Sequence, residues 1–192
     1  CLTPKVAKNE LQKLQFKKNH IVISLVSTIS LKDLKKFCSP SKNIFKAGPL
    51  PFASSCKSPT IIYPKNININ NFFKKLGFVV NPKNERQNDH FWVMTATMAT
   101  YANFLAELHT YLIKNKVNKI DAGEYLYELS AGLNELIKHE KYNFKKVVSD
   151  LQTKKGINQQ LLSALSKKNL YKHLNLQLKK IYKRIKKAND QG

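Results

Sequence analysis

The sequence predicts an α/β region over residues 1–80 followed by an all-α region over residues 81–192. Before residue 80, short β-branched runs alternate with helical segments, which is the order found in βαβ units and a largely parallel sheet. After residue 81, apolar residues recur every three or four positions and the strand pattern does not return. We therefore expect the C-terminal part of a parallel sheet domain joined to a helical bundle.

Helices and strands are expected in turn within the α/β region. Ser30 precedes Leu31 and Leu34 at helical spacing, and a serine at this point typically caps the first turn of a helix. Gly77 ends another helical run. The expected helices cover residues 9–18, 31–37 and 70–76, and the expected strands cover residues 20–26, 43–46, 60–63 and 78–80.

One apolar stripe dominates the all-α region and continues for more than about five helical turns, along one long helix or two abutting ones. It consists of Phe91, Met94, Met98, Tyr101, Leu105, Leu108 and Leu112. The stripe is longer than a region of this size needs for its own core, so we expect a second subunit to share it. The alternative is that helices starting near Ala122 and Leu170 cover it within one chain.

Four further helices are expected over residues 122–139, 144–151, 160–165 and 170–185. The last is amphipathic, and we expect its apolar side to pack on the bundle while its lysines stay in solvent. Its apolar residues are Leu174, Leu178, Ile181 and Ile185.

Composition narrows the classes of protein. The net charge is +22, but only two of the 34 basic residues are arginines, whereas phosphate and base recognition favours the bidentate guanidinium. Nucleic-acid binding is therefore the less favoured alternative. The three cysteines form no C-x-x-C pair and the five histidines are scattered, so no metal site is expected. Asp89 and Glu107 lie several helical turns apart, and we expect them to be solvated rather than to form an acid pair.

The chain lacks any apolar run of the roughly 20 residues that cross a bilayer, so no membrane association is expected. The unpaired cysteines favour a reduced, cytoplasmic setting. The sequence opens at Cys1 rather than at methionine, which we interpret as an N-terminally truncated chain.

Three segments carry short motifs. Residues 46–52 are Lys-Ala-Gly-Pro-Leu-Pro-Phe, residues 95–101 are Thr-Ala-Thr-Met-Ala-Thr-Tyr, and residues 153–160 are Thr-Lys-Lys-Gly-Ile-Asn-Gln-Gln. In this order and at this spacing they resemble motifs of pyrroline-5-carboxylate reductases, in particular of a divergent bacterial branch of that family. Residues 23–30 also resemble the family's Ile-Ser-Ile-Ala-Ala-Gly-Ile-Ser segment.

This resemblance implies a Rossmann-like dinucleotide-binding domain followed by a helical dimerisation domain. It implies reduction of 1-pyrroline-5-carboxylate to L-proline, with NADPH or NADH as cofactor, a small imine as substrate and a homodimer or higher homo-oligomer. The implied cofactor-binding residues are Pro4, Ser24 and Pro49. The implied catalytic residues are Thr97, Tyr101, Thr153, Gly156 and Asn158. No G-x-G-x-x-G phosphate loop occurs in residues 1–192, so this chain alone is expected to bind dinucleotide poorly.

These assignments have structural alternatives. Thr153 and Gly156 offer a hydroxyl and backbone N–H groups at a helix start, which suit a carboxylate, but the same segment would also be a plain loop with a helix N-cap at Asn158. Thr97 and Tyr101 lie either near the substrate or in a helix–helix contact. Thr3 and Lys155 depart from the family's lysine and glycine. A non-catalytic dimerisation remnant of such an enzyme is the alternative function.

Overall fold

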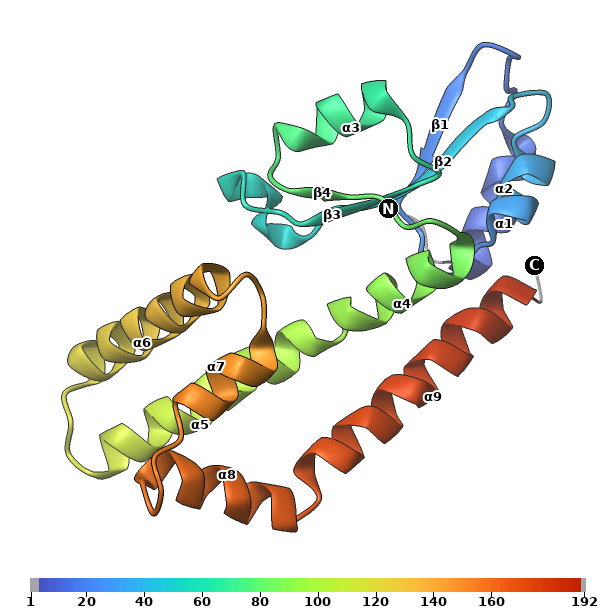
Figure 1. Cartoon of the computed structure of the whole chain (residues 1–192). Coiled ribbons are helices and arrows are strands. Elements are labelled where there is room, and N and C mark those ends of the chain that lie inside the picture. Colours follow the sequence, from blue (N-terminus) through green and yellow to red (C-terminus); the bar gives the residue numbers. More distant parts are fainter. Residues whose placement is uncertain (1–3, 191–192) are drawn as a thin grey trace. The chain divides into compact units, whose positions relative to one another are not determined.

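The computed structural model describes residues 4–190, except for the side chains of Pro4, Lys5, Lys8 and Asp190 (Figure 1). The chain forms two compact units. Unit 1 comprises the described residues up to Ala96 and from Gln177 onward, and unit 2 is Thr97–Leu176. The secondary structure changes where the sequence pattern predicts, because the last described strand ends at Val80 and every described element after it is a helix. The boundary between the two compact units lies further along the chain, after Ala96.

Unit 1 contains a four-stranded sheet with the order β1-β2-β3-β4. The strands are β1 (Ile21–Ser24), β2 (Asn43–Gly48), β3 (Thr60–Tyr63) and β4 (Val79–Val80). β1 pairs in parallel with β2, and β3 with β4, but β2 and β3 run antiparallel. The expected parallel sheet is thus a mixed one. Parallel neighbours need a crossover, usually through an α-helix, whereas β2 and β3 are joined by a loop that contains only the short 3-10 helix η1 (Pro51–Ser55) among the described residues.

The helices of this α/β segment are α1 (Pro4–Lys13), α2 (Leu31–Phe37), α3 (Ile67–Lys74) and α4 (Glu85–Thr95). Loop side chains cap three of them. Ser30 Oγ accepts a hydrogen bond from a backbone N–H of α2, as predicted, and Asn66 and Asn84 do the same for α3 and α4. Each cap satisfies a donor that the start of a helix leaves without an intrahelical partner.

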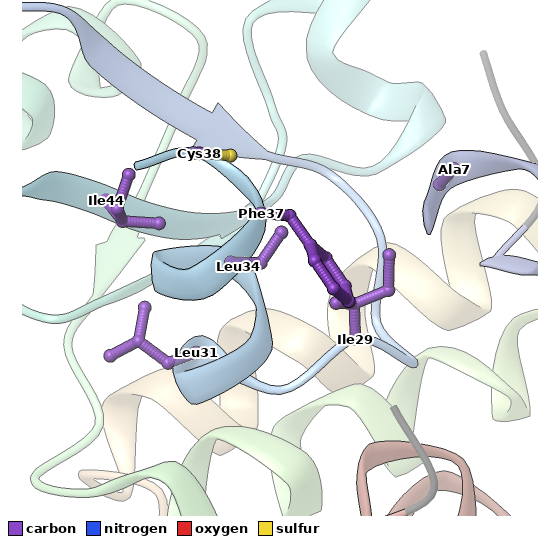
Figure 2. Close-up of a cluster of buried hydrophobic side chains, with 7 residues drawn as sticks. All are labelled: Ala7, Ile29, Leu31, Leu34, Phe37, Cys38 and Ile44. Atoms are coloured by element: carbon purple, nitrogen blue, oxygen red, sulfur yellow. The ribbon is translucent and has the colours of Figure 1, made fainter. Parts of the chain in front are cut away.

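The alternation of side chains along β2 decides what each face of the sheet carries. Ile44, Lys46 and Gly48 lie on one face, and residues 45 and 47 lie on the other. Ile44 belongs to a buried cluster with side chains of α2, and Figure 2 shows Leu34 and Phe37 of that cluster. On the opposite face, Ala47 packs in a second cluster with residues of β3 and α3. The sheet is therefore covered by helices on both faces.

Unit 2 is entirely helical over its described residues. It contains α5 (Thr97–Lys114), α6 (Lys119–His139), α7 (Phe144–Asp150), α8 (Ile157–Lys167) and the first two turns of α9 (Leu170–Asp190). The predicted stripe thus runs over two abutting helices, α4 and α5, which meet at Ala96. Few side chains of unit 2 are buried, and none of those lies on α5. Tyr101 is 53% exposed and Phe104 is 50% exposed, so α6 covers only part of the stripe.

The last two-thirds of α9, from Gln177 onward, belong to unit 1. Ile185 is buried, and the ring of Tyr182 stacks on His90 of α4 at a centroid distance of 4.2 Å. The amphipathic helix is as predicted, but this part of it packs on α4 rather than on the bundle of unit 2. Leu174 is 40% exposed, so the expectation that all four apolar residues are covered is wrong at that residue.

Candidate functional site

The carboxyl ends of β1 and β2 bring two of the predicted cofactor-binding residues to one edge of the sheet. Ser24 is the last residue of β1 and lies opposite Lys46 of β2, and Pro49 directly follows β2. Ser24 is nearly buried, and its Oγ accepts a hydrogen bond of 3.3 Å from the N–H of Val26. Ligands of α/β sheets bind at this edge, beyond the carboxyl ends of parallel strands.

A groove of about 300 Å³ lies beside Ser24, between β1 and α1. Its lining is mostly apolar and includes Ala7, Leu11 and Val26. Pro4 is the first residue of α1, but its side chain is outside the described residues. Thr3 also lies outside them.

A buried lysine lies on β2 within the first motif. The side chain of Lys46 is fully buried, and its Nζ donates to the carbonyl oxygen of Ser27 at 3.3 Å and lies 3.8 Å from Oε1 of Glu85. Burial lowers the pKa of Lys46, because the charged form loses its hydration, and the nearby carboxylates of Glu85 and Asp89 oppose that shift. Lys46 is therefore an internal cation held by two anions of α4.

The two carboxylates lie one turn apart on α4 and connect it to other elements. Glu85 Oε1 accepts the N–H of Leu31 at the start of α2 at 2.7 Å, and Asp89 Oδ1 accepts a hydrogen bond of 3.3 Å from Asn189 of α9. Burial raises the pKa of Asp89, with Lys46 lowering it and Glu85 raising it further. Asp89 is only 6% exposed, so the expectation that it is solvated is wrong.

Sequence reasoning missed this cluster because Lys46 lies about 40 positions before Glu85 and Asp89 in the chain. One signal was present: Glu85 and Asp89 have the i, i+4 spacing that places two side chains on the same face of a helix. The burial of Lys46 on β2 could not be predicted in this way, because it depends on how the strands of the sheet pair.

Gly48 lets α4 approach the end of β2. A Cβ built at this glycine would lie 2.9 Å from two ring carbons of Trp92, closer than real Cβ contacts come. One turn earlier on α4, Asn88 is fully buried. In the part of the chain that the structure describes, Trp92 Nε1 and Asn88 Oδ1 are buried without a hydrogen-bond partner. The face of α4 that packs toward β2 thus combines a tight contact with unused polar atoms.

Two of the predicted catalytic residues lie at the start of α5 in unit 2. Thr97 is the first residue of this helix and is half-buried. Tyr101 lines a groove of about 590 Å³ between α5 and α6, together with Leu105 and His109 of α5 and Leu126 of α6. No residue of this helix is buried in the single chain.

Of the other three predicted catalytic residues, Thr153 and Gly156 lie between α7 and α8, and Asn158 lies in the first turn of α8. Gly156, not Asn158, is the N-cap of α8, so the alternative of a cap at Asn158 is wrong. The Nδ2 of Asn158 donates to the carbonyl oxygen of Leu151 at 3.1 Å, and the N–H of Gly156 donates to the carbonyl oxygen of Thr153 at 2.8 Å. A Cβ at residue 156 would overlap Oγ1 of Thr153, so a larger residue there requires the Thr153 hydroxyl to move.

The helix start at Gly156 is open to an anion. Gly156 supplies no side-chain acceptor to the first turn of α8, and Lys155 adopts a left-handed conformation with φ of 64°. Thr153 is exposed, so its hydroxyl and the first turn of α8 face solvent. Among the described residues, no hydrogen bond links Tyr101 to this turn, so one chain does not unite the two halves of the predicted site through such a bond.

The described residues contain no group of three or more His, Cys, Asp or Glu side chains placed to hold a metal ion. None of their helices is both long and apolar enough to cross a membrane.

Solved structures show what the chain resembles, although no family model and no curated protein matches its sequence. A pyrroline carboxylate reductase of Plasmodium falciparum with NADP bound has a TM-score of 0.85 at 16% identity, over 98% of this chain and 79% of that one. The 1-pyrroline-5-carboxylate reductase of Streptococcus pyogenes has a TM-score of 0.83 at 18% identity, over 99% of this chain and 74% of that one. The chain has the fold of a pyrroline-5-carboxylate reductase.

A third such enzyme, from Coxiella burnetii, gives a TM-score of 0.76 at 16% identity and covers 98% of this chain and 74% of its own. The likeness therefore includes both the sheet and the helices, as the motifs predicted. At this identity it establishes the fold, and the reaction has to be argued from the residues.

Proposed function

We propose that the protein containing this chain is an NAD(P)H-dependent oxidoreductase that reduces 1-pyrroline-5-carboxylate to L-proline, as part of proline biosynthesis in the cytoplasm. The observation that carries the proposal is the likeness to three pyrroline-5-carboxylate reductases over at least 98% of the chain, one of them with NADP bound. The order of the three sequence motifs supports it independently.

The residues present fit only part of a dinucleotide. Ser24 and Pro49 lie at the sheet edge where such a ligand would extend, and Pro4 begins the helix beside it. The six glycines of the chain nowhere form a G-x-G-x-x-G turn, so residues 1–192 contain no loop of this kind to hold the pyrophosphate. When bound in the complete protein, the dinucleotide supplies the hydride.

The substrate carboxylate is assigned to the start of α8. There the backbone N–H groups of the first turn and the hydroxyl of Thr153 face solvent, and the helix dipole favours a negative charge. Asn158 holds the turn through its bond to the carbonyl oxygen of Leu151. Thr97 and Tyr101 are assigned to the ring of the substrate, which reaches them from the α8 turn of a second subunit.

The second subunit follows from exposed apolar surface. Unit 2 leaves many large apolar side chains in solvent, among them Tyr101 of α5 and Tyr127 of α6, which line the same groove at 53% and 67% exposure. A soluble protein rarely leaves a contiguous apolar face of several hundred Å² uncovered. An interface between two copies of α5 and α6 would cover this face, which supports a homodimer or higher homo-oligomer.

A test of the reaction uses the complete coding sequence that contains these residues. The purified protein is expected to oxidise NADPH or NADH only when 1-pyrroline-5-carboxylate is present, with L-proline as product. Thr153→Val removes the hydroxyl at nearly constant volume. It is expected to raise the KM for 1-pyrroline-5-carboxylate by about tenfold, because one hydrogen bond to a charged group is lost. Ser163→Ala, on the exposed side of α8, is the matched control and should leave KM unchanged.

The runner-up function is a non-catalytic helical dimerisation module. It is favoured by the same exposed helices of unit 2 together with the absence of a Gly-rich loop from residues 1–192. A complete protein that dimerises but neither binds a nicotinamide cofactor nor forms proline would establish this function and would contradict the reductase.

A further inference from the structure

A second pocket lies within unit 1, beside the cluster of Lys46, Glu85 and Asp89. It has a volume of about 520 Å³ and is formed by the loop before α2, by α4 and by the C-terminal half of α9. None of the residues predicted for cofactor or substrate lines it. Its lining is dominated by charged and hydrogen-bonding side chains, which include Glu85, Arg86, Asp89, Tyr182, Lys186 and Asn189.

The floor of the pocket carries an excess of negative charge. Glu85 and Asp89 supply two carboxylates, and the buried Nζ of Lys46 behind them supplies one ammonium. In the part of the chain that the structure describes, the floor thus has two carboxyl groups for one buried amine, so negative charge is in excess there whenever both carboxyl groups are ionised. Asp89 is 6% exposed, so solvent screens this charge poorly.

The rim carries the opposite charge. Arg86 of α4 and Lys186 of α9 are both exposed, and neither forms an ion pair with another described residue. Their side chains line the same pocket as the two carboxylates. The pocket thus presents anions at its floor and cations at its rim.

Two further side chains give the pocket fixed walls. Tyr182 is stacked flat on His90, with an interplanar angle of 5°. Asn189 is 9% exposed and donates its Nδ2 to Asp89, but its Oδ1 is buried without a hydrogen-bond partner in the part of the chain that the structure describes. A buried acceptor left without a donor costs free energy, and a ligand donor at this position would relieve that cost.

We propose that this pocket binds a small zwitterion of the amino-acid class, with its ammonium group on Glu85, Asp89 and the Oδ1 of Asn189, and its carboxylate on Arg86 and Lys186. A simple anion would meet the negative floor, and a simple cation would leave the two rim cations without a partner. A divalent metal is disfavoured because no third carboxylate, histidine or cysteine joins the two described carboxylates.

This proposal does not depend on the reductase function, since it concerns a different pocket and is tested without cofactor or substrate. The purified chain is titrated by calorimetry with the common free L-amino acids, each up to about 10 mM. At least one is expected to bind with a Kd of about 1 mM or tighter, a weak affinity in keeping with so small a ligand.

Analogues of the best binder test the two ends separately. Its N-acetyl derivative lacks the ammonium and its amide lacks the carboxylate, and each is expected to bind at least about tenfold more weakly because charged hydrogen bonds are lost. Lys186→Gln is expected to weaken binding about fivefold, as fits a partly exposed ion pair. Lys187→Gln, the neighbouring lysine of α9 that does not line the pocket, is the matched control and should bind as the unaltered chain does.

Three results would overturn the proposal. The first is that no free amino acid binds below about 10 mM. The second is that either single-ended analogue binds as tightly as the parent. The third is that Lys186→Gln and Lys187→Gln affect binding equally, which would indicate a general effect of the basic surface. Both lysines are exposed, so neither substitution is expected to prevent folding.

Discussion

Lys46 Nζ of β2 lies 3.8 Å from Glu85 Oε1 of α4, and the lysine side chain is fully buried. This contact, with Asp89 one turn later, ties the first residues of α4 to the centre of the sheet. In the chain, α4 is followed directly by α5, where two of the proposed site residues lie.

Lys46→Met tests that role. Methionine nearly keeps the volume of lysine but leaves Glu85 and Asp89 without their internal cation. We expect the free energy of unfolding to fall by about 2 kcal/mol. This loss is smaller than for a fully buried pair because Glu85 is partly exposed. Urea denaturation measures the free energy of unfolding of the variant and of the unaltered chain. Adding Asp89→Asn should recover part of the loss, whereas equal stability of Lys46→Met and the unaltered chain would show that the cluster contributes nothing.

Asp89 is expected to make stability depend on pH. The pKa of Asp89 is raised in the folded chain. At pH values between its pKa in the unfolded state and its pKa in the folded state, the folded state therefore binds more protons than the unfolded state. The free energy of unfolding falls as the pH rises through this range. Asp89→Asn does not titrate. The stability of this variant relative to the unaltered chain should therefore improve as the pH rises above about 4, the ordinary pKa of an aspartate, and it should level off once Asp89 is ionised in both states. A relative stability that worsens over this range would contradict the raised pKa.

Gly48→Ala is expected to cost about 1–3 kcal/mol, because the new methyl group meets the ring of Trp92 at 2.9 Å. Trp92 is the only tryptophan, so its fluorescence reports the disturbance directly. Gly132→Ala in α6 is the control: its Cβ would meet nothing within 4 Å, and alanine should stabilise the helix by roughly 0.5–1 kcal/mol. Equal effects of the two changes would refute the close contact.

The proposed homodimer is tested by Leu105→Asp. Leu105 lies in the apolar groove between α5 and α6, and a carboxylate there should prevent a second copy from packing on it. Sedimentation at micromolar concentration should show a dimer for the unaltered chain and a monomer for the variant. Asn103→Asp adds the same charge at an exposed position of the same helix and should remain dimeric. A monomeric unaltered chain would contradict the interface.

Residues 1–192 alone are expected to show no saturable binding of NADPH and no reduction of 1-pyrroline-5-carboxylate, because they contain no Gly-rich loop for the pyrophosphate. Fluorescence titration of the 192-residue chain measures the binding. Micromolar affinity would mean that other residues of this chain hold the dinucleotide.

Much of the fold was predictable from local patterns. Ser30 marks a helix start through chemistry that acts over a few residues, and the period of apolar residues separated strands from helices. The predicted end at Gly77 was less exact, because α3 ends at Lys74. The antiparallel pairing of β2 and β3 was not predictable in the same way, since it depends on the path of the loop over residues 49–59 rather than on the strands themselves.

The candidate sites show the same difference between features set by local sequence and features set by distant contacts. Sequence patterns put Ser24 in a strand, Pro49 in a loop and Gly156 before a helix, and these positions agree with the structure. The alternative of an N-cap at Asn158 was wrong, because Gly156 is the N-cap of α8. The buried ion cluster and the pocket beside α9 were missed, since they depend on contacts such as that between Asp89 and Asn189, which lie 100 residues apart.

The most direct test of the proposed reaction follows deuterium from the cofactor into the product. The complete protein is incubated with 1-pyrroline-5-carboxylate and with NADPH or NADH carrying deuterium on either face of the nicotinamide ring, and the product is examined by mass spectrometry. The proposal predicts L-proline that carries one deuterium from one of the two labelled faces, at the carbon of the former carbon–nitrogen double bond. Proline without deuterium from either face, or no proline at all, would contradict it.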